Sequence, residues 1–482
     1  MHRRTWMKSG LVYGAASLAL LVAACETSPP DAATVPEAAT DTAEADTIIV
    51  TGSKRVEGDE EAAPPPPPPS PVAAARSRAV LGEGLSEARS SSDITYKPVP
   101  VPPLDGPRPQ PAPQSGLLTA GDYDDVLNPD LYKAYLDKTL QAGGDARLPY
   151  VDAADRIAVR VTDRLGKPLP FADVALTTAQ GEEMFPLRTG ANGTVYLYPA
   201  FDALSAGTQI SVSVDGGNEQ TRTLSQNLLD TGGTLPVIIS ADAAKVQKLD
   251  VLLTLDATGS MSDEMAYLQT ELTSIMTRME RANPELDIRA GLIVYRDKGD
   301  EYVIRDFDFT GDLDAFKNTL AQQEANGGGD FPEAMHTAQE RGLGLSWRDD
   351  AIKVNLLVAD APPHDADITA TWETALHARV RGIHTVPIAA SGVDPKAEFL
   401  MRAMGQVTGG RYLFLTDDSG VGNPHAEPTV DCYIVTPLNS LVQRVLESLV
   451  LGRRVEPSAD IVVRTVGNYQ AGVCNIDDAS NE

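Results

Sequence analysis

The chain has 482 residues, of which 42% are hydrophobic, and this size and apolar content allow two or three domains with packed cores. A formal net charge of -28 argues against nucleic acid as a partner and favours metal ions or basic partners. Prolines crowd the first quarter of the chain, where apolar residues are sparse, so we expect folded structure to start near residue 150.

The first 24 residues have the layout of a secretory signal peptide. A basic start precedes an apolar run at residues 11–24, which is short for a membrane-spanning helix. The run closes on Val-Ala-Ala-Cys at residues 22–25, which resembles the lipobox of bacterial lipoproteins. That resemblance implies acylation of Cys25 and a lipid anchor in the cell envelope. An ordinary signal peptide with an incidental cysteine is the alternative.

Residues 25–149 are predicted to form a disordered, proline-rich linker. An unbroken run of prolines fills residues 64–69, and residues 98–113 are again rich in proline. Such stretches favour extended polyproline geometry over packing, so the segment is expected to act as a semi-rigid stalk. A short helix is predicted within it at residues 128–141, where Pro129 would occupy the first helical position.

Residues 150–245 are predicted to form a small β-sandwich. Turn signals such as Asn192-Gly193 separate short segments in which apolar and polar residues alternate, at residues 157–161, 174–176, 195–197 and 210–214. This region resembles the Ig-like or regulatory-like sandwich modules of exported bacterial proteins. Its residues do not show the spacing of a catalytic site, so we expect this region to serve as a spacer or an accessory binding surface.

From residue 248 the pattern changes to alternating strands and helices. Nearly continuous apolar runs predict buried strands at residues 249–255, 288–295, 352–359 and 383–389. Apolar residues spaced three and four positions apart predict a helix at residues 265–279. The segments between and after the later strands predict helices at residues 331–341, 369–381 and 397–407. This alternation predicts an α/β fold with a doubly wound, mainly parallel, Rossmann-like sheet.

Three polar loops are expected to meet at the carboxyl edge of that sheet, where ligands of such folds bind. Asp256, Thr258 and Ser260 alternate directly after the first strand, so one carboxylate and two hydroxyls can face a common point. Asp330 and Asp360 follow in two neighbouring loops. Because hard cations prefer oxygen ligands, this set predicts a site for Mg²⁺, or for Mn²⁺ or Ca²⁺, with one position open for a carboxylate of a partner.

The pattern Asp-x-Thr-x-Ser that starts at Asp256 resembles the metal-ion-dependent adhesion site of von Willebrand factor A domains, with threonine where serine is more usual. Asp360 matches the distal aspartate of that family. Asp330, in the sequence GGGDFPE, stands where many members have threonine and resembles a bacterial and alpha-kinase-associated branch with the signature GGGDxPE. The resemblance implies a von Willebrand factor A domain at residues 248–450. Its extra carboxylate leaves less positive charge for an acidic ligand.

Each motif also has a simpler interpretation. Ser262 could merely cap a helix after an ordinary strand-to-helix turn, and a Gly-rich segment is usually a loop. His364 could donate to the site or face solvent. The charged stretch that includes Asp297, Asp300 and Glu301 could form a recognition rim or a solvated surface. A hydrolase built on Ser260 is disfavoured, because the G-x-S-x-G nucleophile sequence is absent.

Cys432 and Cys474 form an even pair in a chain that is expected to be exported, which predicts a disulfide joining the C-terminal extension, residues 451–482, to the domain. Two buried thiols are the alternative. Together these features predict a non-enzymatic adhesion or scaffold module that binds a protein partner through a cation. A metal-dependent hydrolase and a structural protein with a stabilising metal are the other hypotheses. Glu26 after Cys25, in place of aspartate, favours the outer membrane.

Overall fold

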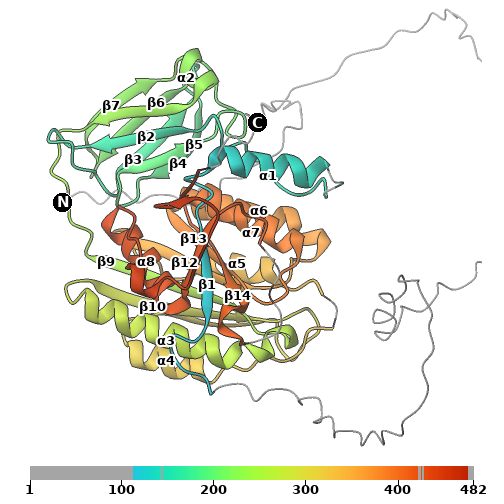
Figure 1. Ribbon diagram of the computed structural model, residues 1–482. Helices are drawn as coiled ribbons and strands as arrows, with labels where there is room; N and C mark the ends of the chain where they lie inside the picture. Colours follow the sequence, from blue (N-terminus) through green and yellow to red (C-terminus); the bar gives the residue numbers. More distant parts are fainter. Residues whose placement is uncertain are drawn as a thin grey trace, which may run out of the picture. The chain divides into compact units, whose positions relative to one another are not determined.

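The computed structural model describes most of the chain after the proline-rich segment, namely residues 112–475 without 142, 144, 330, 422–424, 426 and 427 (Figure 1). None of the helices in these residues combines the length and the hydropathy that crossing a bilayer requires. The predicted signal peptide, Cys25 and the linker up to residue 111 lie outside the described residues.

A large mixed sheet forms the centre of this part of the chain. Its strand order is β11-β10-β9-β12-β13-β14-β1-β15-β16. Five neighbouring strands run parallel: β10 (Asp287–Tyr295), β9 (Lys248–Asp256), β12 (Ile352–Ala359), β13 (Ile383–Ala389) and β14 (Tyr412–Thr416). Every residue of β12 is buried, and so are all residues of β9 after the first. Continuous apolar strands of this kind are stable only where both faces of the sheet are covered.

The edges of the sheet are antiparallel. β11 (Ile304–Thr310) pairs with β10 at one edge, and β16 (Arg464–Val466) pairs with β15 (Tyr433–Pro437) at the other. The charged, largely exposed sequence of β11 suits an edge that faces solvent.

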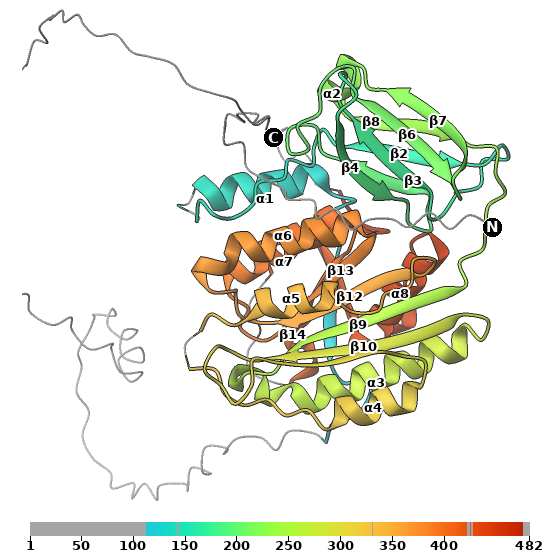
Figure 2. The ribbon, with the colours of Figure 1, turned by 180° about the vertical axis from the view of Figure 1, so that it is seen from behind.

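Helices cover both faces of the sheet (Figures 1 and 2). One face packs in a single hydrophobic cluster with α3 (Met265–Ala282), α4 (Leu313–Ala321) and α8 (Leu438–Leu451). The opposite face packs in a second cluster with α1 (Pro129–Gln141), α5 (Met335–Leu343), α6 (Ile368–Val380) and α7 (Pro395–Thr408). The predicted α/β class, with a large and mostly parallel sheet, is confirmed.

One predicted helix begins later than expected. The sequence favours a helix from residue 331, whereas α5 starts at Met335. The Glu333 backbone instead extends beside the loop after β12: its N–H donates to the Pro362 carbonyl at 2.9 Å, and Glu333 forms a β-bridge with Pro363. A contact between distant segments therefore overrides the local preference for helix.

The prediction that residues 25–149 are all linker is wrong for the last part of that range. β1 (Thr119–Tyr123) lies inside the large sheet, antiparallel to both β14 and β15. All five residues are buried, although their sequence, TAGDY, has no apolar alternation. The predicted helix after it is present as α1, and Tyr132, Tyr135 and Leu136 of α1 pack into the core.

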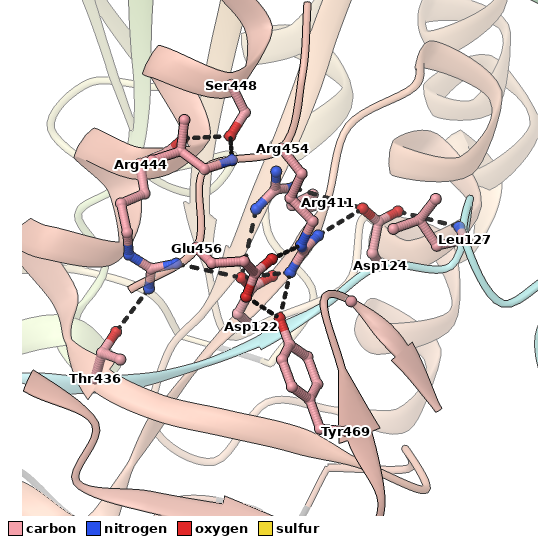
Figure 3. A network of polar contacts seen from close by, with 12 residues as sticks. Asp122, Asp124, Leu127, Arg411, Thr436, Arg444, Ser448, Arg454, Glu456 and Tyr469 are labelled. Carbon is pink, nitrogen blue, oxygen red and sulfur yellow. Dashed lines mark hydrogen bonds and ion pairs between the residues drawn. The ribbon is translucent and has the colours of Figure 1, made fainter. Parts of the chain in front are cut away.

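A buried ionic network around Asp122, the charged residue of β1, holds this strand in place (Figure 3). Asp122 is fully buried, and its Oδ2 lies 2.8 Å from Arg454 Nη2, 3.4 Å from Arg411 Nη1 and 3.8 Å from Arg444 Nη1. Burial raises the pKa of Asp122, but the three guanidinium charges outweigh burial and leave the pKa below its usual value. The charged Asp122 therefore links β1 to the residues just before β14, through Arg411, and to α8 and the residues after it, through Arg444 and Arg454.

Two smaller sheets lie between β1 and β9 in the sequence. The first has the order β5-β2-β8 and the second the order β4-β3-β6-β7, with a short helix, α2 (Gln226–Thr231), before β8. The apolar residues of both sheets form one shared cluster. The strands are β2 (Ile157–Thr162), β3 (Asp173–Thr177), β4 (Glu183–Arg188), β5 (Thr194–Leu197), β6 (Gln209–Val214), β7 (Gly217–Thr223) and β8 (Gly233–Ile238).

The segment after α8 folds back onto the start of the described chain. A disulfide joins Cys432 and Cys474, as predicted, with their Cα atoms 5.6 Å apart. Cys474 lies in a small hairpin of β17 (Tyr469–Gln470) and β18 (Val473–Cys474). The Asn128 side chain donates to the Gly472 carbonyl at 2.7 Å and accepts from the Cys474 N–H at 2.8 Å. The hairpin is thus attached to the rest of the chain both by the disulfide and by the hydrogen bonds of Asn128.

Candidate functional site

The candidate site lies where the connections of the large sheet change face. β9 and β12 are neighbouring parallel strands, yet the helix after β9, α3, covers one face, and the helix after β12, α6, covers the other. The loops therefore part at the carboxyl ends of these two strands, at the switch point, called the crevice below, where doubly wound folds bind ligands. Asp256 ends β9, and Asp360 directly follows β12.

The loop after β9 arranges one carboxylate and two hydroxyls. Asp256 Oδ1 accepts hydrogen bonds from the Thr258 N–H at 3.0 Å and from Thr258 Oγ1 at 2.8 Å. Thr258 Oγ1 lies 3.2 Å from Ser260 Oγ. A 3-10 helix, Gly259–Asp263, turns the chain sharply toward α3, so alternate side chains remain on one side of the loop.

Asp360 completes this group from the neighbouring strand. Its side chain is 3% exposed, and its carbonyl accepts a hydrogen bond from the Asp394 N–H at 2.9 Å, which ties the loop after β12 to the start of α7. A hydrogen bond from the Ser260 side chain acts on the Asp360 carboxyl, and the charge of Asp360 acts on Asp256. The structure thus brings together Asp256, Thr258, Ser260 and Asp360, whereas Asp330 lies outside the described residues.

Glu333 is a further acidic neighbour that the sequence prediction left out of the site. Its side chain is buried beside Thr258 and Gly328: a Cβ atom on Gly328 would lie 3.1 Å from Glu333 Oε1 and 3.2 Å from Thr258 Cβ. Gly328 also has a positive φ of 70°, a backbone conformation that favours glycine. The glutamate of the GGGDxPE signature was the available signal.

The carboxyl groups of the site are buried, and their negative charges act on one another. Burial, followed by the charge of Asp360, raises the pKa of Asp256 to about 7. Burial, followed by the charges of Asp256, Asp297 and Asp360, raises the pKa of Glu333 to about 9. Burial is also the largest cause of the raised pKa of Asp360. Buried acids with raised pKa values are typical of functional sites, and a bound cation would favour their charged forms.

Three carboxylate oxygens of the site are buried without a hydrogen-bond partner: Asp256 Oδ2, Asp360 Oδ1 and Glu333 Oε2. Unpaired buried polar atoms are costly, so these three oxygens mark positions at which a bound ligand would supply the missing partner. Only oxygen donors are present in this group, which suits a hard divalent cation. Within the described residues, no group of three or more His, Cys, Asp or Glu side chains is placed to hold a metal ion.

The charged residues around the crevice have structural partners. His364 Nε2 lies 2.5 Å from Asp297 Oδ1, so this histidine is paired and does not simply face solvent. Asp300 Oδ2 accepts from the Gly328 N–H at 2.9 Å and braces the glycine loop. Because Ser260 interacts with Thr258 and Asp360, and His364 with Asp297, the structure assembles no Ser-His pair for a hydrolase among these residues.

Comparison with known families places the crevice in a defined domain. Residues 250–387, well under half of the chain, match the family described as von Willebrand factor A domain. Residues 250–387 form a von Willebrand factor A-type domain. The match contains Asp256, Thr258, Ser260, Glu333 and Asp360, and it leaves β1, β14 and β15 of the large sheet outside its bounds.

Two curated proteins are similar to part of this chain. An ariadne-like RING finger protein of Acanthamoeba polyphaga mimivirus is 29% identical over 188 residues, which cover 35% of this chain and 18% of the relative. The alpha-protein kinase vwkA of Dictyostelium discoideum is 26% identical over 120 residues, which cover 25% of this chain and 19% of the relative. The chain thus spans less than a fifth of the length of either protein.

Among solved structures, the conserved hypothetical protein BatB from Bacteroides thetaiotaomicron is similar, with 11% sequence identity and a TM-score of 0.30. The similarity covers 42% of this chain and 98% of BatB.

Proposed function

We propose that the von Willebrand factor A-type domain binds a protein partner through a divalent cation. Domains of this type commonly mediate protein interactions. The observation that carries the proposal is the set of unpaired, buried carboxylate oxygens on Asp256, Asp360 and Glu333 at the switch point of the sheet. Asp256, Thr258, Ser260 and Asp360 would hold the ion, and Asp330 would add a ligand or a second negative charge nearby.

A bound Mg²⁺, Mn²⁺ or Ca²⁺ would supply an open coordination position for a carboxylate of the partner. The protein itself contributes three things. Asp256 and Asp360 provide charge, the hydroxyls of Thr258 and Ser260 orient the carboxylates through hydrogen bonds, and Glu333 closes the crevice from the glycine loop. Phe331, whose side chain is 48% exposed beside this loop, offers the partner an apolar contact.

Calorimetric titration of the full chain with each of the three cations tests the proposal. We expect binding of one ion per chain, weakened by roughly 100-fold or more in Asp256→Asn and in Asp360→Asn, because losing even an outer-shell partner costs about 10- to 100-fold. Asp314→Asn is the matched control, since Asp314 is an exposed aspartate on α4 paired only with Lys317. Unchanged affinity in both site variants would refute the cation site.

Partner capture then distinguishes adhesion from a structural role of the metal. Immobilised wild-type chain is incubated with envelope extract in Mg²⁺ or in chelator, alongside the Asp256→Asn variant. Recovery of a specific protein only by the wild type in Mg²⁺ is the expected result. Equal recovery with chelator would mean that the metal, if bound, only stabilises the domain.

We also propose that the chain is anchored in the cell envelope by a lipid on Cys25, with the outer membrane favoured. The support is the sequence alone: a short apolar leader that closes on Val-Ala-Ala-Cys, followed by the proline-rich stalk, with the two smaller sheets as a sandwich-like spacer. Metabolic labelling with a radioactive fatty acid should mark the wild-type chain and leave Cys25→Ala unlabelled. Equal labelling of both chains, or of neither, would contradict the anchor.

A further inference from the structure

A second candidate site lies at the amino ends of the parallel strands, away from the carboxyl ends that form the first site. A cavity of about 250 Å³ opens at the amino ends of β12 and β13, next to the loops of the two smaller sheets and the carboxyl ends of α6, α7 and α8. Its walls carry two carboxylates, Asp124 and Asp349, and seven permanent cations: Arg188, Lys353, Arg379, Arg381, Arg411, Arg453 and Arg454. Such an excess of positive charge is unexpected in a chain with a net charge of -28.

Part of this positive charge is neutralised by buried ion pairs. Arg379 forms two hydrogen bonds with the Asp202 carboxylate, at 2.7 and 2.8 Å. Arg411 and Arg454 belong to the network of Asp122 and Asp124 described above (Figure 3). These ion pairs stabilise the fold, which accounts for the presence of the three arginines.

Lys353, Arg381 and Arg188 are different, because backbone carbonyls supply most of their hydrogen bonds; Arg188 also lies 3.5 Å from the carboxylate of Asp173, whose side chain is largely exposed. Lys353 is 5% exposed; its Nζ donates to the Arg381 carbonyl at 3.0 Å, and its acidic neighbour, Asp349, is 3.9 Å away on a side chain that is 95% exposed. Arg381 donates to the Leu343 carbonyl, and Arg188 donates to the carbonyls of two further residues.

The three cations also lie close to one another. A Cβ atom on Gly382, the neighbour of Arg381, would lie 3.8 Å from Arg188 Cβ. Burial, together with the positive charges of Arg188 and Arg381, leaves the pKa of Lys353 below its usual value. Burial likewise lowers the pKa of Arg381. Like charges held close together repel one another, and a bound anion between them would offset that repulsion.

Helix capping offers a competing explanation for these residues. Lys353 and Arg381 reach carbonyls at the carboxyl ends of α6 and α5, where cations are favoured. A neutral amide would satisfy the same carbonyls without the desolvation cost of a buried charge. Capping therefore explains the hydrogen bonds but leaves the charge of Lys353 without a function.

We propose that this cavity binds a small organic anion whose carboxylate or phosphate group contacts Lys353, Arg381 and Arg188. The remaining walls suit the apolar body of such a molecule, since they include Leu127, Phe171, Leu187, Val195, Ile352 and Leu449. The cavity, at about 250 Å³, is of the order of size that binds a small organic molecule. Its position at the amino edge of the sheet also separates it from the proposed cation site at the carboxyl edge.

Calorimetry of the full chain at constant ionic strength tests the proposal with phenyl phosphate, benzoate, inorganic phosphate and uncharged phenol. Binding of one phenyl phosphate or one benzoate per chain, tighter than phosphate or phenol, is expected, and the stronger of the two identifies the anionic group. Lys353→Gln and Arg381→Gln should each weaken binding by at least about tenfold, since each removes a charge pair with the ligand. No heat with either aromatic anion would overturn the proposal.

Arg278→Gln is the matched control, because Arg278 is an exposed cation on α3 and its loss changes the net charge equally. The same loss of affinity in this control would reduce the effect to general electrostatics and overturn the site. Without anion, Lys353→Gln should melt at or above the wild-type temperature, since glutamine keeps a donor for the Arg381 carbonyl and removes the buried charge. Should that variant fail to fold, Arg381→Lys, which keeps the charge, must retain binding and Arg188→Gln must lose it.

Discussion

A chain that begins at Asn128, and so lacks β1, is expected not to fold into a stable domain, whereas a chain that begins at residue 112 should fold. Removal of β1 would separate β14 from β15, because each pairs with β1 and they are not neighbours. It would also leave the arginines of the Asp122 network buried without that aspartate. We expect a loss of more than about 5 kcal/mol in the free energy of unfolding, which is the whole stability of many domains.

Urea denaturation of the two truncated chains, followed by circular dichroism, measures this effect. The chain that begins at residue 112 controls for loss of the preceding sequence. A cooperative transition at the same midpoint in both chains would show that β1 is dispensable.

Asp122→Asn is expected to cost about 3 to 5 kcal/mol of unfolding free energy, because the change removes the only charge that Arg411, Arg444 and Arg454 share. The pKa of Asp122 is lowered in the folded protein, so this stabilisation is present at neutral pH and is lost as the pH falls through the folded-state pKa. The destabilisation by Asp122→Asn should therefore shrink in acid.

A partner substitution separates the ionic role of Asp122 from a packing role. Arg444 has two buried guanidinium nitrogens, Nε and Nη1, without a hydrogen-bond partner, and burial lowers its pKa. Combining Arg444→Met with Asp122→Asn should recover part of the lost stability, as measured by urea denaturation. Asp418→Asn, in a surface pair with Arg464, is the control and should cost less than about 1 kcal/mol. Equal costs for the two asparagine variants would contradict the network.

Local patterns were sufficient for the parallel core of the sheet. The predicted strand at residues 383–389 coincides with β13, and the strands predicted at 249–255 and 352–359 correspond to β9 and β12. A strand that is covered on both faces is apolar over most of its length, so its sequence indicates that it is buried. The order of those strands also places Asp256 and Asp360 at one edge, which is why a candidate site could be predicted from the sequence.

Contacts between distant segments decided the rest, because no local pattern encodes them. TAGDY becomes a central strand only because β14 and β15 offer hydrogen bonds on both sides and three arginines neutralise Asp122. Glu333 joins the acidic crevice only because Pro362 and Pro363 hold its backbone extended. The sequence by itself determined which segments are apolar enough to be buried. The tertiary structure determined which polar residues are buried with them, since a buried charge is stable only beside partners brought from elsewhere in the chain.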